Sequence, residues 1–185
     1  MSRQEAGPGP AGGESVDLRR FIRDVPDFPK KGIVFKDITP LLQDSQALRH
    51  ALHTLAERFK GRAISKVIGI ESRGYIFAPA IALSLGAGFV PVRKPGKLPW
   101  KTASEEYSLE YGTDRLEIHL DALRPGENVL IVDDLLATGG TASATRRLAE
   151  RLQARVVGAG FLVELTFLEG RARLPGIDVV SLIEF

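Results

Sequence analysis

The chain has 185 residues, of which 44% are hydrophobic and none is cysteine, and its formal net charge is +2. The hydrophobic content suits one compact domain, while the lack of cysteine excludes disulfides, thiolate metal sites and a cysteine nucleophile. A net charge this small is no argument for nucleic acid as a partner, and no apolar run reaches the roughly 18 residues that a membrane span needs. We therefore expect a cytoplasmic protein that binds neither nucleic acid nor a membrane.

The chain begins with a segment rich in glycine and proline, residues 1–15. It lacks the apolar core of a signal peptide, so we expect a flexible tail followed by a single domain over 16–185. Apolar residues at helical spacing then predict an amphipathic helix over 46–59. The short apolar run 66–70 predicts a buried strand.

The sequence next predicts a helix over 74–87 and a strand over 88–94. The polar stretch after it contains Pro95, Gly96 and Pro99, and leads into an alternating pattern around a turn at 112–114 that is typical of a β-hairpin. We expect a mobile arm over about 97–113.

The last part of the chain predicts strands over 128–132, 156–165 and 179–185, with a helix over 141–154. Strands alternating with helices favour an α/β fold, in which a mostly parallel central sheet is flanked by helices on both faces. Ligands of such sheets bind beyond the carboxyl ends of the strands.

The most informative stretch is VLIVDDLLATGGTA, residues 129–142. Its glycines let backbone amides approach a ligand, and a helix N-terminus adds unpaired N–H groups, so the loop predicts a phosphate site. The adjacent carboxylates of Asp133 and Asp134 repel each other unless they find partners, which the hydroxyls of a ribose would supply. The loop residues are Ala137, Thr138, Gly139, Gly140 and Thr141.

Cations follow two other predicted strands: Arg73, and then Arg93, Lys94 and Lys97. Because the carboxyl ends of parallel strands meet at one edge, these side chains should lie near the phosphate loop. Guanidinium and ammonium groups there indicate a second, highly charged anion. A ribose phosphate that also carries a diphosphate is phosphoribosyl diphosphate.

The stretch 129–142 resembles the signature of the type I phosphoribosyltransferases. Within that family, further segments are similar to the adenine phosphoribosyltransferases, and the similarity runs from about residue 17 to the C-terminus. These segments are VPDFPKKGIVFKDITPLL (25–42), GIESRGYIFAPAIA (69–82), PVRKPGKLP (91–99), YSLEYG (107–112) and VELTFLEGR (163–171). The resemblance implies the type I fold with a small hood and a flexible β-hairpin lid, a homodimer, and transfer of a phosphoribosyl group from phosphoribosyl diphosphate to adenine.

The resemblance also implies roles for particular residues. The loop 137–141 would hold the 5-phosphate, and Asp133 and Asp134 would face the ribose hydroxyls. The diphosphate would bind Ser72, Arg73, Arg93 and Lys97, with a cis peptide at Glu71–Ser72 and Mg²⁺ held mainly by the diphosphate. Lys94 would point to solvent or to a dimer partner. No protein ligand for the metal is assigned.

For the base and its chemistry, the resemblance points to the hood and the lid. Adenine would lie on Val34, Phe35 and Lys36, although Phe35 could instead be a core residue. Lys36 stands where the family commonly has arginine, which weakens any contact made by that side chain. Glu110 would handle the purine proton, with Tyr111 beside it in the lid; Arg73 is the second catalytic candidate.

The resemblance implies structural roles for three further residues. Asp37 would order its segment, and Glu164 and Arg171 would serve as scaffold or dimer contacts. Two other functions stay open: a phosphoribosyltransferase for a different base, and a regulator that binds phosphoribosyl diphosphate without catalysis.

Overall fold

The computed structural model describes residues 16–108 and 113–185, and the chain divides into two compact units, residues 1–47 and 48–185. The expected tail, residues 1–15, lies outside the described part. None of the helices within it is long and apolar enough to cross a membrane.

The first unit contains an antiparallel hairpin that the sequence patterns did not predict. Its strands are β1 (Arg23–Pro26) and β2 (Val34–Asp37), preceded by η1 (Leu18–Phe21) and followed by α1 (Thr39–Gln43). The Asp37 carboxylate accepts hydrogen bonds from the backbone N–H of Thr39 at 2.9 Å and from its hydroxyl at 2.8 Å. Asp37 therefore orders the start of α1, as expected.

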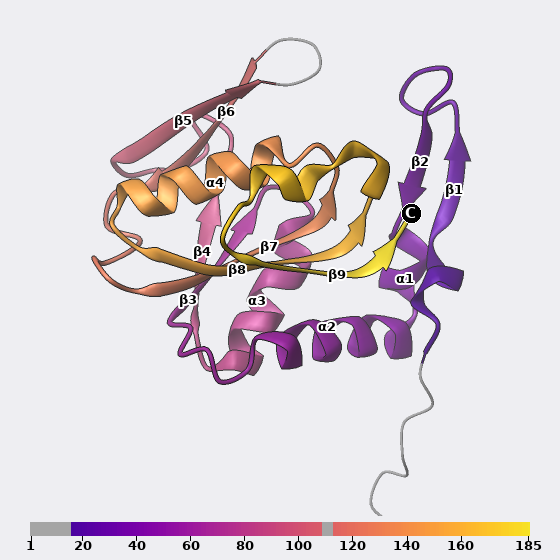
Figure 1. Ribbon diagram of the computed structural model, residues 1–185, viewed down its shortest axis with the longest axis horizontal. Helices are drawn as coiled ribbons and strands as arrows, with labels where there is room; N and C mark the ends of the chain where they lie inside the picture. The colour runs from indigo at the N-terminus through magenta and orange to yellow at the C-terminus, as the bar shows by residue number, and fades with distance from the viewer. Residues whose placement is uncertain (1–15, 109–112) are drawn as a thin grey trace, which may run out of the picture. The chain divides into compact units, whose positions relative to one another are not determined.

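A parallel sheet with the strand order β4-β3-β7-β8-β9 forms the centre of residues 48–185 (Figure 1). Its strands are β3 (Lys66–Ile70), β4 (Gly88–Val92), β7 (Asn128–Leu136), β8 (Arg155–Glu164) and β9 (Asp178–Glu184). The chain runs outward from β3 to β4 and later returns to place β7 on the other side of β3. This reversal creates a switch point between β3 and β7, where open α/β sheets bind ligands.

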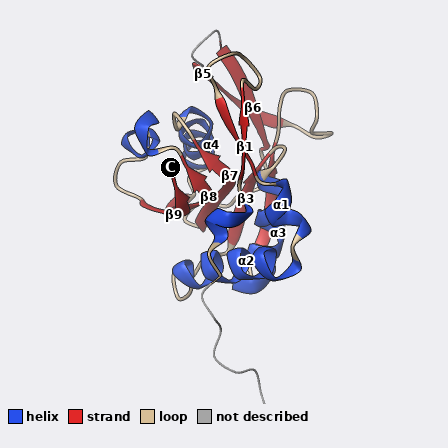
Figure 2. Cartoon of the chain, turned by 90° about the vertical axis from the view of Figure 1, so that its right-hand side faces the viewer, coloured by secondary structure: helices blue, strands red, loops and turns tan. Residues whose placement is uncertain are grey.

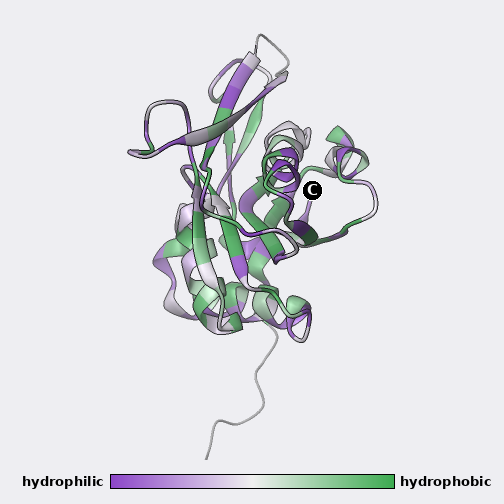
Figure 3. Ribbon diagram, turned by 90° about the vertical axis from the view of Figure 1, so that its left-hand side faces the viewer, coloured by the Kyte–Doolittle hydropathy of each residue, from purple (hydrophilic) through white to green (hydrophobic). Residues whose placement is uncertain are grey.

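Helices cover both faces of the sheet (Figures 1 and 2): α2 (Ser45–Phe59) and α3 (Gly74–Leu85) on one face, and α4 (Gly140–Arg151) on the other. Close packing of α2 depends on two glycines of β8, because a Cβ at Gly158 or Gly160 would press on the ring of Phe59. Among the buried side chains of α4, Ala144 and Leu148 belong to the core on the opposite face. Hydrophobic residues accordingly gather on the central strands in Figure 3. The structure thus confirms the expected α/β architecture.

One strand is longer than expected: β7 continues through Asp133 and Asp134 and ends at Leu136. The two acids therefore lie within the strand, and Asp133 is paired in register with Phe161 of β8. The apolar residues Leu135 and Leu136, which follow the acids, keep the parallel ladder with β8 intact.

The expected hairpin is formed by β5 (Thr102–Ser108) and β6 (Thr113–His119). Thr113 and Asp114 belong to β6, so the predicted turn at 112–114 is wrong for these two residues. Tertiary contacts of the Asp114 side chain, described below, outweigh the turn preference of the sequence.

The β5–β6 hairpin is attached to α4 through one carboxylate. Glu105 accepts hydrogen bonds from Arg147 Nε and Arg151 Nη2, both at 2.6 Å, and Arg151 also donates to the carbonyl of Ser104 at 2.8 Å. Ala103, Leu116 and Ile118 are buried beneath it. The base of the expected arm is therefore packed against the helix.

Candidate functional site

A cavity of about 300 Å³ opens at the carboxyl ends of β3 and β7, beside the β5–β6 hairpin. It lies at the switch point of the sheet, where the fold leaves the ends of adjacent strands accessible. Four segments far apart in the sequence supply its lining, which is Glu71, Ser72, Arg73, Lys94, Tyr107, Asp114, Leu116 and residues 133–142.

The loop after β7 presents backbone to this cavity. It consists of residues 137–139 and leads directly into α4, whose N-cap is Gly139. Gly139 has φ +77°, a conformation that a residue with a side chain adopts only at a cost. The N-terminus of α4 therefore points unpaired N–H groups and a partial positive charge toward the cavity, which suits a phosphate.

The two acids of β7 differ in their partners. Asp134 is buried and forms an ion pair with Arg73, whose Nε lies 2.9 Å from the Asp134 Oδ2. Asp133 is half-buried and accepts a hydrogen bond from the Asp134 N–H at 2.9 Å. Burial raises the pKa of both carboxyl groups; the negative charge of Asp134 raises that of Asp133 further, whereas Arg73 opposes the rise at Asp134. Both groups would gain from hydroxyl donors or a cation.

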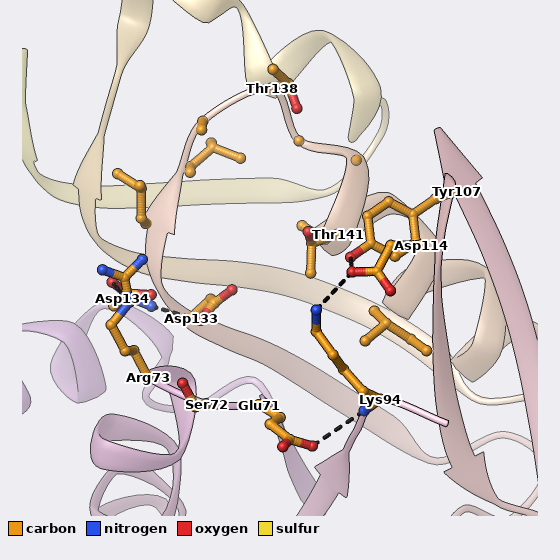
Figure 4. Close-up of a pocket in the computed structure, with 17 residues that line it drawn as sticks. Glu71, Ser72, Arg73, Lys94, Tyr107, Asp114, Asp133, Asp134, Thr138 and Thr141 are labelled. Carbon is orange, nitrogen blue, oxygen red and sulfur yellow. Dashed lines mark hydrogen bonds and ion pairs between the residues drawn. The ribbon is translucent and has the colours of Figure 1, made fainter. Parts of the chain in front are cut away.

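The loop after β3 contains a cis peptide at Glu71–Ser72, as expected. Glu71 fastens this loop to the end of β4, because its carboxylate accepts hydrogen bonds from Arg93 Nε at 2.9 Å and from the Lys94 N–H at 3.2 Å. The hydrogen bond from Arg93 lowers the pKa of Glu71. Ser72 and Arg73 are thereby held at the cavity (Figure 4).

On the hairpin side, the cavity is closed by a polar cluster (Figure 4). Lys94 Nζ donates to Asp114 Oδ2 at 2.9 Å, and the Tyr107 hydroxyl donates to the same oxygen at 3.3 Å. Thr141, in the first turn of α4, lines the same cavity as Tyr107. The cluster therefore links the end of β4 to the hairpin.

The structure brings most of the predicted phosphate-site residues together. Those that line the cavity are Ser72, Arg73, Asp133, Asp134, Ala137, Thr138, Gly139, Gly140 and Thr141. Arg93 and Lys97 are absent from the described lining: Arg93 binds Glu71 and donates to the Lys97 carbonyl at 3.1 Å. Lys94, by contrast, lines the cavity although it was expected to face solvent or a partner.

The residues predicted for the base belong to the first unit. Val34, Phe35 and Lys36 form β2 of the first unit, where Phe35 is half-buried and packs edge to face on Phe28 with ring centroids 5.2 Å apart. Lys36 Nζ donates to Asp24 across the hairpin at 2.6 Å. Glu110 and Tyr111 lie outside the described residues.

Sequence reasoning missed Tyr107 and Asp114 as parts of the cavity. They face each other in the β5–β6 register, and Tyr107 shares the buried face of β5 with Ala103. That two-residue alternation was the available signal. In the described part of the chain, no group of three His, Cys, Asp or Glu residues could hold a metal ion.

Comparison with protein families and relatives agrees with this geometry. Residues 37–174 match the model of the phosphoribosyl transferase domain. The adenine phosphoribosyltransferase of Symbiobacterium thermophilum is 59% identical over 170 residues, which are 92% of this chain and 100% of that protein.

Solved structures extend the comparison. Adenine phosphoribosyltransferase from Thermoanaerobacter pseudethanolicus has a TM-score of 0.89 and 54% identity, with 91% of this chain and 98% of that chain covered. The enzyme from Saccharomyces cerevisiae, in complex with an imino-altritol bisphosphate and adenine, has a TM-score of 0.84 and 41% identity, with 90% and 96% covered.

Proposed function

This chain belongs to the phosphoribosyltransferase family, among the adenine phosphoribosyltransferases, and from this premise we infer that it makes AMP by purine salvage. It transfers the 5-phosphoribosyl group of phosphoribosyl diphosphate to N9 of adenine and releases diphosphate. The observation that carries this function is the cavity in which the phosphate loop, the acid pair and the Ser72–Arg73 loop meet.

We propose that residues 137–141 hold the 5-phosphate of the substrate. The glycines and the start of α4 support this assignment, since backbone N–H groups there can surround phosphate oxygens without a lysine. The hydroxyls of Thr138 and Thr141 add two donors.

Asp133 and Asp134 are proposed to accept hydrogen bonds from the ribose 2- and 3-hydroxyls. Their burial supports this role. Each carboxylate loses hydrogen bonds from water when it is buried, and the hydroxyls of a ribose would replace those donors. The negative charge of these groups would also stabilise the positive charge that develops on the ribose ring in the transition state.

The diphosphate is proposed to bind Ser72, Arg73 and Lys94 in the cavity. Arg93 and Lys97, which follow β4 together with Lys94, are proposed to contribute as well. Arg73 would exchange or share its contact with Asp134. The guanidinium would neutralise charge on the leaving group, which makes Arg73 a catalytic residue as well as a binding residue.

In the reaction, the N9 lone pair of adenine forms the new bond to C1 of the ribose while the bond from C1 to the diphosphate oxygen breaks. The proton that adenine loses passes to Glu110, the proposed general base, and Tyr111 belongs to the lid that excludes water. Val34, Phe35 and Lys36 are proposed to bind the base, with Phe35 stacking on the purine and backbone groups reading its edge.

Mg²⁺ is proposed to accompany the diphosphate, where it would neutralise the leaving group. It would bind mainly through oxygens of the diphosphate. The buried carboxylate of Asp133, whose pKa is raised by burial and by the charge of Asp134, would gain from a nearby cation.

A homodimer in the cytoplasm is proposed for the intact protein. Exposed apolar side chains on α3 and the neighbouring edge strand β4 support association: Ile76 is 42% exposed, Leu83 82% and Phe89 37%. The lack of cysteine is compatible with a reducing compartment. Light scattering would test the dimer directly.

One assay tests the enzymatic proposal. The protein is incubated with Mg²⁺, phosphoribosyl diphosphate and each nucleobase in turn, and diphosphate release is followed. We expect turnover with adenine. Turnover with hypoxanthine or guanine but not adenine would indicate another base specificity, and no turnover with any base would favour a regulator that only binds phosphoribosyl diphosphate.

A further inference from the structure

An ion pair outside the cavity lies between the last two strands and the phosphate loop. Glu164, at the end of β8, is only 2% exposed. It accepts hydrogen bonds from Arg171 Nε at 2.7 and 2.9 Å, from Arg171 Nη2 at 2.6 Å and from the Ser181 hydroxyl at 2.6 Å. Although burial would raise its pKa, these partners lower it, so the pair is fully charged at neutral pH.

Arg171 also binds the neighbouring strand. Its Nη1 donates to the carbonyl of Val179 on β9 at 2.7 Å, and its Nη2 reaches Glu184 at 3.3 Å. A single guanidinium therefore joins η3 (Gly170–Arg173) to both β8 and β9. The planar arrangement of donors that this requires is specific to arginine.

The residue before Arg171 contacts the phosphate loop directly. A Cβ at Gly170 would overlap the carbonyl oxygen of Ala137, and a Cβ at Gly139 would overlap the carbonyl oxygen of Gly170. The two backbones thus touch with no side chain between them. A displacement of η3 has to move the loop, because no flexible group is available to absorb it.

We propose that Arg171 is a positioning residue for the 5-phosphate loop, acting through Gly170. Arg171 is not itself a lining residue of the described cavity. Its bonds to Glu164 and Val179 fix η3, and η3 supports the loop from behind. This inference rests on the proposed assignment of residues 137–141 to the 5-phosphate.

The test uses Arg171→Met and Arg171→Lys in the full chain, with Arg62→Met as the matched control. Arg62 also pairs with an acid of β9, Asp178, at 2.5 Å, and donates to the Val157 carbonyl at 3.4 Å, but none of these residues lines the cavity. The affinities for ribose 5-phosphate and for magnesium diphosphate are measured by calorimetry, together with the melting temperature.

We expect Arg171→Met to weaken ribose 5-phosphate binding at least tenfold and to change diphosphate binding less than twofold. Arg171→Lys should lie between it and the wild type, since an ammonium group replaces part of the contact. Arg62→Met should lower the melting temperature while leaving both affinities unchanged.

Unchanged ribose 5-phosphate affinity in a folded Arg171→Met variant would overturn the proposal, and so would equal losses for both ligands. If Arg171→Met does not fold, Arg171→Lys and Glu164→Gln carry the same test. Failure of the wild type to bind ribose 5-phosphate would instead contradict the assignment of the loop.

Discussion

Lys94 and Asp114 join the end of β4 to the hairpin, with the Lys94 ammonium 2.9 Å from the Asp114 carboxylate. Both residues line the cavity proposed for phosphoribosyl diphosphate. The Asp114 carboxylate therefore pairs with the Lys94 ammonium group that the diphosphate would also bind. Burial raises the pKa of Asp114, but the hydrogen bonds that its carboxylate accepts and the positive charge of Lys94 together lower it.

We expect Asp114→Asn to bind magnesium diphosphate about fivefold more tightly, because one unit of repulsive charge in a partly solvated site is worth about 1 kcal/mol. Asparagine keeps the shape and can still accept from Lys94. Calorimetric titration measures the change. Glu106→Gln removes an exposed acid of the same hairpin and should have little effect; equal tightening in both variants would point to net charge alone.

Glu105 attaches the hairpin to α4, so its neutralisation should loosen that attachment. We expect Glu105→Gln to lower the free energy of unfolding by about 1–2 kcal/mol, between the values for exposed and fully buried ion pairs, since both arginines are about half exposed. Urea denaturation measures the change. The exposed pair of Glu106 with Arg115 again supplies a control, with an expected cost under ~0.5 kcal/mol; equal costs would contradict the attachment.

The negative charge of Asp133, next to Asp134, should lower the free energy of unfolding. The folded state raises the pKa of Asp133, so it favours the protonated carboxyl, and the wild type loses stability as the pH rises through the folded pKa. Asp133→Asn should therefore be more stable than the wild type by ~1 kcal/mol at pH 8, and the difference should shrink as the pH falls. Thermal melts across pH 5–9, with the exposed Asp121→Asn as control, measure this; a constant difference would contradict the explanation.

Glu110 carries the proposed proton transfer. Glu110→Gln should lower turnover by about 10²-fold and leave the affinity for phosphoribosyl diphosphate within about twofold. Single-turnover kinetics and calorimetry separate the two quantities. Equal losses in turnover and affinity would count against a role in chemistry, and Glu106→Gln should preserve both.

The central sheet and its helices could be predicted because their apolar patterns are long and agree with the parallel topology. Strand β7 is longer than predicted. Two adjacent acids normally end a buried strand, whereas here the hydrogen-bonded ladder with β8 continues beyond them. The β1–β2 hairpin was missed because each of its strands has only four residues and neither contains a buried residue.

Within the site, the sequence predicted the loop and the acids, whose residue types are distinctive. It could not decide which cation after β4 faces the cavity, because successive residues of an extended chain point in opposite directions. Gly139 shows a second limit. The ligand was the expected reason for glycine there, yet the Gly170 carbonyl already leaves no room for a side chain.

The parallel pairing of β3 with β7 has a consequence for how the protein acquires its activity. It joins Lys66 to Val129, so a long stretch of chain must be ordered before the two strand ends that form the cavity meet. Long-range pairing of parallel strands is slow to form. We expect diphosphate binding during refolding to return together with the slowest structural phase, so that the ligand reports completion of the native state.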